Sequence, residues 1–242
     1  MIFSRKPFGS IQVKKTVLLF FIGLSTICCL SKSMSTINLE KIPYRKVRKY
    51  ITEREIDQMN DFSLIHASCK KETIEPDFNV NQVVFYLKYD PTEVWNCYRN
   101  IDPLKTWNRK SLRFGLMISK LSNTVTYIDN TTPIRVDTGQ VYFLNLRLLK
   151  GLLNIPVAFE IINIDQNRKV AEYSYIDNNK ARGKQVLEFL DDGNGGTKIV
   201  HRSYFKSGSS FRDNFIYPIF HKKFIKEFHR NMRQTIKDES VT

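Results

Sequence analysis

The stretch YDPTEVWNCYRNIDPLKTW, from Tyr89 to Trp107, contains two consecutive helix starts. Asp90 supplies a side-chain acceptor at an N-cap, and Pro91 follows at the first helical position, where its missing N–H is not needed. Pro103 ends this helix and opens a second short turn. The apolar residues of the first helix fall on one face: Val94, Trp95, Cys97, Tyr98 and Ile101. We therefore expect two short helices in succession.

Strand-like segments lie on both sides of these helices. Before them, VNQVVFYLKY, at 80–89, is rich in β-branched and aromatic residues. After them, runs of the same character occur at 114–119, 124–128, 141–148, 157–164, 170–176, 184–190 and 198–205. Turns rich in Asp, Asn and Gly join several of these runs, at 129–130, 165–167, 177–179 and 191–196. Consecutive strands with short polar turns predict an antiparallel sheet.

The last segment, from Ser209 to Lys237, changes to a helical period. Its apolar residues recur every four positions at Ile216, Phe220, Phe224 and Phe228, with Ile225, Met232 and Ile236 beside them. Its basic residues are Lys222, Lys223, Lys226, Arg230 and Arg233. We expect a long amphipathic helix with a kink at Pro218.

This order of elements resembles the START-like, Bet v 1-like (SRPBCC, polyketide cyclase-type) superfamily, which has the helix-grip fold. Residues 89–107 are similar to its first strand-to-helix segment, 159–175 to its central hairpin and 183–205 to its last two strands. The resemblance covers about residues 78 to 238, and we place the domain at 79–238. It implies an α+β architecture in which a curved antiparallel sheet of about six or seven strands surrounds the long C-terminal helix, with two short helices after the first strand.

The resemblance also implies a ligand, because members of this superfamily hold lipids, sterols, polyketides or other apolar molecules between sheet and helix. A single helix cannot fill the concavity of a large curved sheet, so a hollow lined by aromatic residues remains. Our first interpretation is a non-enzymatic carrier or sensor of an apolar small molecule or lipid, with no cofactor. The alternatives are an enzyme of the same fold (a cyclase, dehydratase or hydrolase of an apolar substrate) and a membrane-surface or protein-interaction module.

Alternation along the strands selects the candidate ligand residues. Tyr173 and Tyr175 share a face, and the same reasoning aligns Phe189 and His201 on the next two strands. The alternative is an ordinary core, in which a buried tyrosine only hydrogen-bonds to a neighbour. The predicted ligand-binding residues are Tyr173, Tyr175, Phe189, His201, Glu160, Phe220 and Phe224.

Glu160 stands in the apolar run VAFEII and faces the same way as Ala158 and Ile162. Facing inward, its carboxylate would pair with a cation such as His201 or bind the polar head of a ligand, and the two would form the one acid–base pair available to an enzyme. Facing outward, it would be solvated. Both orientations remain open.

Motifs for other chemistry are missing from the sequence. It has no HxxH or HExxH pair, no GxSxG, no P-loop and no GxGxxG, and we expect no metal site. His221 and His229 lie eight residues apart on the last helix, too far apart to share a metal ion. Cys69 and Cys97 would be able to pair in an oxidising compartment, but the position of Cys97 on an apolar helix face favours an inert thiol.

The N-terminus has the pattern of a targeting signal. Residues 1–15 carry four basic side chains and no acid, and an apolar run follows at 16–30. As a helix this run would reach ~22 Å, short of the ~30 Å hydrocarbon core of a bilayer. A cleaved signal peptide within residues 1–33 is therefore favoured over a membrane anchor or a buried helix. The protein would be exported (secreted, periplasmic or lumenal) or anchored through 16–30, and cleavage lowers its net charge from +14 to +9.

Residues 34–78 are expected to form a basic linker and N-terminal extension wrapped on the main domain. Thr52 and Glu55 have the spacing of a capping box that opens a short helix over 52–60. Five cations occur in one acid-free stretch of this segment: Lys41, Arg45, Lys46, Arg48 and Lys49. They fit an anionic membrane surface, although a solvated linker is the simpler interpretation. No motif accompanies them that would indicate nucleic acid.

Overall fold

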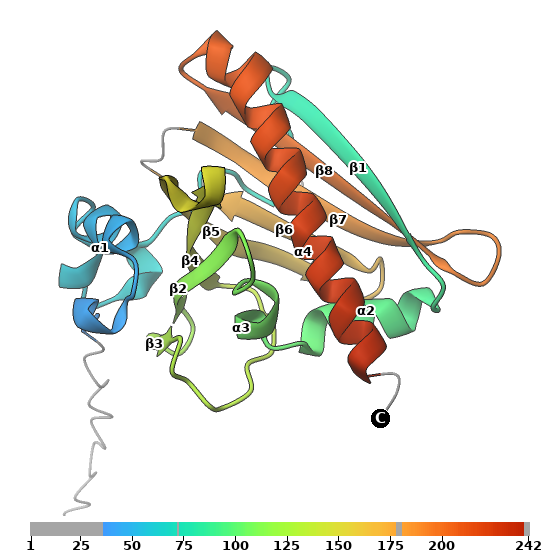
Figure 1. Cartoon of the computed structure of the whole chain (residues 1–242), viewed down its shortest axis with the longest axis horizontal. Helices are drawn as coiled ribbons and strands as arrows, with labels where there is room; N and C mark the ends of the chain where they lie inside the picture. The colour runs from blue at the N-terminus through green and yellow to red at the C-terminus, as the bar shows by residue number, and fades with distance from the viewer. Residues whose placement is uncertain (1–35, 72, 178–180, 240–242) are drawn as a thin grey trace, which may run out of the picture. The chain divides into compact units, whose positions relative to one another are not determined.

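An eight-stranded antiparallel sheet forms the main layer of this computed structural model, which describes residues 36–71, 73–177 and 181–239 (Figure 1). The strands are β1 (Asn79–Leu87), β2 (Leu112–Ser119), β3 (Thr124–Tyr127), β4 (Gln140–Leu148), β5 (Leu153–Asp165), β6 (Val170–Tyr175), β7 (Ala181–Asp191) and β8 (Thr197–Ser207). They pair in the order β1-β8-β7-β6-β5-β4-β2-β3. The expected count of six or seven was slightly low, since the first strand pairs with the last and the short β3 adds an edge.

The α-helices are α1 (Arg45–Thr52), α2 (Pro91–Asn100), α3 (Pro103–Thr106) and α4 (Tyr217–Glu239). Short 3-10 turns occur at η1 (Leu39–Lys41), η2 (Ile56–Gln58), η3 (Phe62–Leu64) and η4 (Leu149–Gly151), and a π-helical turn, η5, at Arg212–Ile216. The predicted start of α2 is confirmed, because the Asp90 carboxylate accepts hydrogen bonds from the backbone N–H groups of Thr92 and Glu93 at 2.7 and 3.3 Å. No helix in the described ranges is long and apolar enough to cross a bilayer. The targeting segment at 16–30 lies outside those ranges.

The long C-terminal helix α4 crosses one face of the sheet (Figure 1). Its expected disturbance at Pro218 takes the form of the π-turn η5, in which the N–H of Tyr217 bonds to the carbonyl of Arg212. Proline cannot donate to the preceding turn and its ring crowds the carbonyl four residues back. The wider π-turn directly before Pro218 accommodates this local disruption of the helix.

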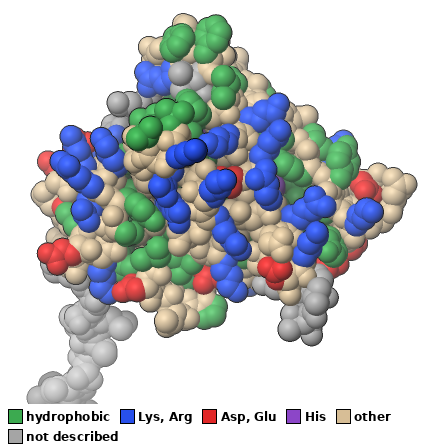
Figure 2. Space-filling view, in the orientation of Figure 1, with side chains coloured by type: hydrophobic (Ala, Val, Ile, Leu, Met, Phe, Trp, Pro, Cys, Tyr) green, Lys and Arg blue, Asp and Glu red, His purple; other side chains and the backbone are tan. Residues whose placement is uncertain are grey.

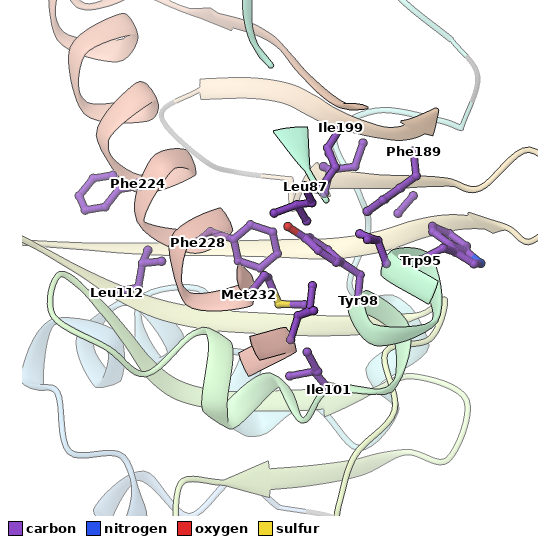
Figure 3. Packing of buried hydrophobic residues seen from close by; sticks show 14 of the residues in the cluster. Leu87, Trp95, Tyr98, Ile101, Leu112, Phe189, Ile199, Phe224, Phe228 and Met232 are labelled. Atoms are coloured by element: carbon purple, nitrogen blue, oxygen red, sulfur yellow. The ribbon is translucent and has the colours of Figure 1, made fainter. Parts of the chain in front are cut away.

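The inner face of the sheet packs against α2 and α4. Figure 3 shows Phe228 and Met232 of α4 close to Tyr98 of α2, while Phe224 lies apart from this group along α4. The ring of Phe228 also stacks on Trp107, with centroids 4.3 Å apart. Burial of such side chains stabilises the fold by about 1.5–3 kcal/mol each.

The N-terminal extension covers the opposite face of β2, β4 and β5. Val47 and Ile51 of α1 are buried there against Phe143 of β4. The close approach depends on Gly115, because a Cβ at that position would lie 3.0 Å from Cγ1 of Val47 and 2.8 Å from the carbonyl oxygen of Phe143. The solvated linker considered for 41–50 is therefore a packed helix.

The predicted capping box at Thr52 and Glu55 is wrong. Thr52 is the last residue of α1, and Glu55 adopts a left-handed backbone (φ 55°) before η2. The helix begins seven residues earlier than its polar signal suggested, because burial of Val47, Tyr50 and Ile51 against the sheet determines where this segment is helical.

Candidate functional site: two adjoining hollows between sheet and helix

A small hollow of about 60 Å³ lies between α4 and the inner face of the sheet. Most of its wall is apolar, as the alternation of β4 to β8 requires. Five polar side chains interrupt that wall: Tyr173, Tyr175, Gln185, His201 and His221. A buried polar group must be hydrogen-bonded, so the partners of these five residues determine what the hollow can bind.

His201 belongs to a chain of four side chains, three of them buried and Gln185 half-buried, that runs from α2 through α4 to β8 and β7. The hydroxyl of Tyr98 lies 2.8 Å from Nδ1 of His229, and Nε2 of His229 lies 2.9 Å from Nδ1 of His201. Nε2 of His201 then lies 2.8 Å from Oε1 of Gln185. We call this arrangement the Tyr98–Gln185 chain.

The chain has one proton arrangement that satisfies every member. An amide oxygen only accepts, so His201 donates from Nε2 to Gln185 and accepts at Nδ1. His229 consequently donates from Nε2 to His201 and accepts at Nδ1 from the hydroxyl of Tyr98. This assignment follows from the hydrogen-bond network. It leaves the amide NH₂ of Gln185 as the end of the chain at the hollow.

Burial keeps the chain uncharged near neutral pH. It lowers the pKa of His229 to about 3 and that of His201 well below its usual 6.5, the neighbouring imidazole adding to the effect. Burial also raises the pKa of the Tyr98 hydroxyl well above 10. His201 is thus a neutral imidazole with both nitrogens engaged, and neither nitrogen is available as a general base.

A second polar pair stands where the small hollow opens outward. The hydroxyl of Tyr175 lies 3.0 Å from Nε2 of His221, and Nδ1 of His221 has no hydrogen-bond partner in the described part of the chain. Burial lowers the pKa of His221 to about 4, so the ring is neutral. If Tyr175 donates, His221 carries an unused N–H, and if His221 donates, the Tyr175 hydroxyl is unused. Either way the pair offers one donor to a ligand.

A larger pocket of about 700 Å³ adjoins the small hollow. The two share five lining residues: Leu146, Val157, Tyr175, His221 and Phe224. One side of the pocket is formed by the end of β4 and the start of β5, another by η5 and the first turns of α4, and a third by α1. Its volume falls within the range of about 300–1,000 Å³ that holds small ligands.

The structure brings most of the predicted site residues to these hollows. Tyr173, Tyr175, His201 and Phe224 line the small hollow, and Phe220 lines the larger pocket. Their strand faces are those that alternation predicts.

Phe189 and Glu160 require correction. The ring of Phe189 is buried between Trp95 and Tyr98, at centroid distances of 5.2 and 4.8 Å, and lines neither hollow. Glu160 lies on the opposite face of the sheet, under the N-terminal extension, where its Oε1 is 2.9 Å from Nζ of Lys120. It does not meet His201, and the predicted acid–base pair is not formed.

Several members of the site were missed from the sequence. His221 and His229 were considered only as metal ligands, although His221 stands three residues before Phe224 on the same helix face. The α1 residues that line the larger pocket were also missed, because they belong to no sequence motif. Among the described residues, no three His, Cys, Asp or Glu side chains are grouped to hold a metal ion. Cys69, which is buried, and Cys97, which is half-buried, do not form a disulfide with each other.

Comparison with known proteins places this architecture. No family model matches the chain, and no curated protein matches it. Norcoclaurine synthase of Thalictrum flavum superposes with a TM-score of 0.50 at 8% identity, over 69% of this chain and 99% of that one. A protein of Nitrosomonas europaea gives a TM-score of 0.46 at 11% identity, over 70% of this chain and 100% of that one. The chain therefore has the START-like, Bet v 1-like helix-grip fold.

Proposed function

From the helix-grip fold of this chain and its two adjoining hollows, we propose that the protein binds and carries a hydrophobic small molecule or lipid. The observation that supports this most strongly is that the 60 and 700 Å³ spaces adjoin at Phe224 and the Tyr175–His221 pair, which line both. Apolar walls take the body of the ligand, and the unused donor of the pair is available to an uncharged polar group along that body.

The polar groups of the small hollow favour binding over catalysis. Both nitrogens of His201 are occupied within the Tyr98–Gln185 chain, and Glu160 is held on the far side of the sheet by Lys120. An enzyme of this fold would need a different acid and base. The proposal is therefore a carrier or sensor, in which the buried donors select the ligand.

Mass spectrometry of small molecules that co-purify with the native protein tests this proposal. We expect an apolar or amphiphilic compound that is released on denaturation, and its recovery should decline in Phe224→Trp, which fills the junction of the two hollows. The exposed Tyr86→Trp serves as the control, because it introduces the same ring away from both hollows. A protein that yields no such compound and binds no apolar fluorescent probe would contradict the proposal.

A membrane surface is our second candidate partner, and exposed apolar residues beside the larger pocket favour it. Half of the twelve large hydrophobic side chains that the described residues expose fall in two segments: Leu149, Leu152 and Leu153 at the β4–β5 turn, and Phe211, Phe215 and Ile219 at the start of α4. Figure 2 shows hydrophobic side chains over both segments, with Lys and Arg side chains nearby. Apolar groups within a basic surface are typical of interfacial binding.

The basic stretch on and before α1 adds to this second candidate in part. Arg45 and Lys46 are exposed, whereas Lys41 pairs with Asp129, Lys49 pairs with Glu53, and Arg48 bonds the carbonyl of Ile42. We expect co-sedimentation with anionic vesicles that weakens as salt rises, since a Debye length of ~8 Å at physiological salt screens such contacts. Equal binding to neutral vesicles would contradict the electrostatic part of this proposal.

A further inference from the structure

The charged residues of the larger pocket are gathered on one side of its wall. Lys46 and Lys49 come from α1, Arg54 follows the end of that helix by two residues, and Arg212 comes from η5. The only acid among the lining residues is Glu53, which pairs with Lys49 at 3.4 Å. Four cations against one anion give this rim of the pocket a net positive charge.

One of these cations, Arg54, is held in place by contacts with Tyr50. The guanidinium of Arg54 lies over the ring of Tyr50, 3.7 Å from its centroid, and donates to the Tyr50 carbonyl. Tyr50 itself is buried against the sheet, so the cation is positioned by the core. Lys46 is exposed one turn before Tyr50. Preorganised guanidinium and ammonium groups are the usual partners of carboxylates and phosphates.

Beyond the cations, the residues that line the larger pocket are mostly apolar. Past the cations the pocket wall is formed by Ile155, Pro156, Val157, Phe220 and Phe224. The deepest polar groups, the Tyr175–His221 pair and the Tyr98–Gln185 chain, are neutral. A charged group that entered this interior would lose its hydration without gaining a counter-ion, at a cost of several kcal/mol. The charge of any ligand must therefore remain at the rim.

We infer that the natural ligand is an anionic amphiphile: one carboxylate or phosphate head at the cations of α1 and η5, and an apolar chain that reaches past Phe224. This inference rests on the proposed function and specifies its ligand class. It also gives the N-terminal extension a role in binding, because α1 and the turn after it supply three of the four cations.

The test compares a fluorescent polyene fatty acid with its methyl ester, which has the same chain and no charge. The wild type should bind the acid more tightly. In Lys46→Gln and Arg212→Gln, affinity for the acid should fall about 2- to 5-fold each and affinity for the ester should not change, as expected for partly exposed ion pairs. Lys222→Gln and Lys223→Gln, which are exposed on α4 outside the pocket wall, are the matched controls. Glu53→Gln, which removes the one acid, should tighten acid binding.

The outcomes separate the inference from the proposed function. If neither acid nor ester binds, the carrier function itself fails. If both bind equally and the pocket variants do not differ from the controls, the carrier function stands and the anionic head is wrong. Competition by inorganic phosphate as strong as competition by the fatty acid would also overturn the inference, because it would indicate a plain anion site. Thermal melts of every variant establish that the fold is intact.

Discussion

Nδ1 of His201 lies 2.9 Å from Nε2 of His229, so two buried imidazoles share one hydrogen bond in the interior of the protein. Their exposed fractions are only 3% and 4%, so a charge on either ring would be poorly solvated. Protonation of one ring would also remove an acceptor from the Tyr98–Gln185 chain. The pair therefore links the stability of the fold to pH.

We expect the free energy of unfolding to fall as the pH is lowered from 7 to 5. Both folded-state pKa values lie below the ordinary value of 6.5, His229 at about 3, so the unfolded chain binds more protons and stability rises with pH in this window. The loss amounts to about 2 kcal/mol for His229, and His201 adds a loss in the same direction. Urea unfolding at pH 7, 6 and 5 measures it. His229→Gln should reduce the slope, and the exposed His66→Gln should leave it unchanged.

Tyr98→Phe should destabilise the protein by about 1–3 kcal/mol, because it removes the donor to Nδ1 of His229 and leaves a buried acceptor unsatisfied. The exposed Tyr86→Phe should change the free energy of unfolding by less than about 0.5 kcal/mol. Denaturant melts distinguish the two. A Tyr98→Phe variant as stable as wild type would show that the chain does not need its first donor.

Phe224→Trp should reduce uptake of an apolar fluorescent probe and leave the thermal melt nearly unchanged, because Phe224 lines both hollows. If the side chain were instead enclosed in solid core, the larger ring would overpack it and cost about 1–3 kcal/mol. Probe titration and a melt on the same sample decide between these results. Lower stability with unchanged probe binding would place the hollow elsewhere.

Lys120→Met should destabilise the protein by about 3 kcal/mol without altering probe binding. It leaves the carboxylate of Glu160 buried and uncompensated, on the face of the sheet away from the hollows. The double variant Lys120→Met, Glu160→Leu removes both charges and should recover most of that loss. Reduced probe binding in the double variant would indicate that Glu160 contributes to the site after all.

The mature chain is predicted to begin between Leu30 and Met34, since a short apolar run and small polar residues precede that region. N-terminal sequencing of the protein from its host checks this. A chain that retains 16–30 would favour an anchored protein over an exported one.

The sequence predicts the sheet faces and the start of α2 well because these depend on local rules. Alternation determines that Tyr173 and His201 share the inner face, and the Asp90–Pro91 pair determines a helix start whatever packs on it. Glu160 shows where such rules stop. Alternation assigns it to a face, but β5 has buried residues on both faces here: Phe159 and Ile161 pack with Tyr142 on one, and Ala158 lies under the N-terminal extension on the other. Only the tertiary structure shows that Lys120 lies on the same face of the sheet as Glu160 and pairs with it.

The site itself was only half predictable for the same reason. Its strand residues follow the period of two, whereas the partners of His201 come from α2, α4 and β7 and depend on how the helices are placed. Three of the four cations at the pocket rim come from the segment predicted to be a linker. Three apolar residues in α1 give little helical signal on their own, and their burial against the sheet stabilises the helix.

The close packing of α1 at Gly115 determines how far the chain can be truncated at its N-terminus. The stretch that resembles other proteins starts near residue 78, yet Val47 packs so closely on Gly115 that a Cβ there would lie 3.0 Å from its Cγ1. A fragment that starts near residue 78 would expose Phe143, Val141 and Ile118, on the face of the sheet that the N-terminal extension covers, to solvent. The region that resembles other proteins is therefore shorter than the unit that must be expressed to keep the fold. That unit begins upstream of Ile42.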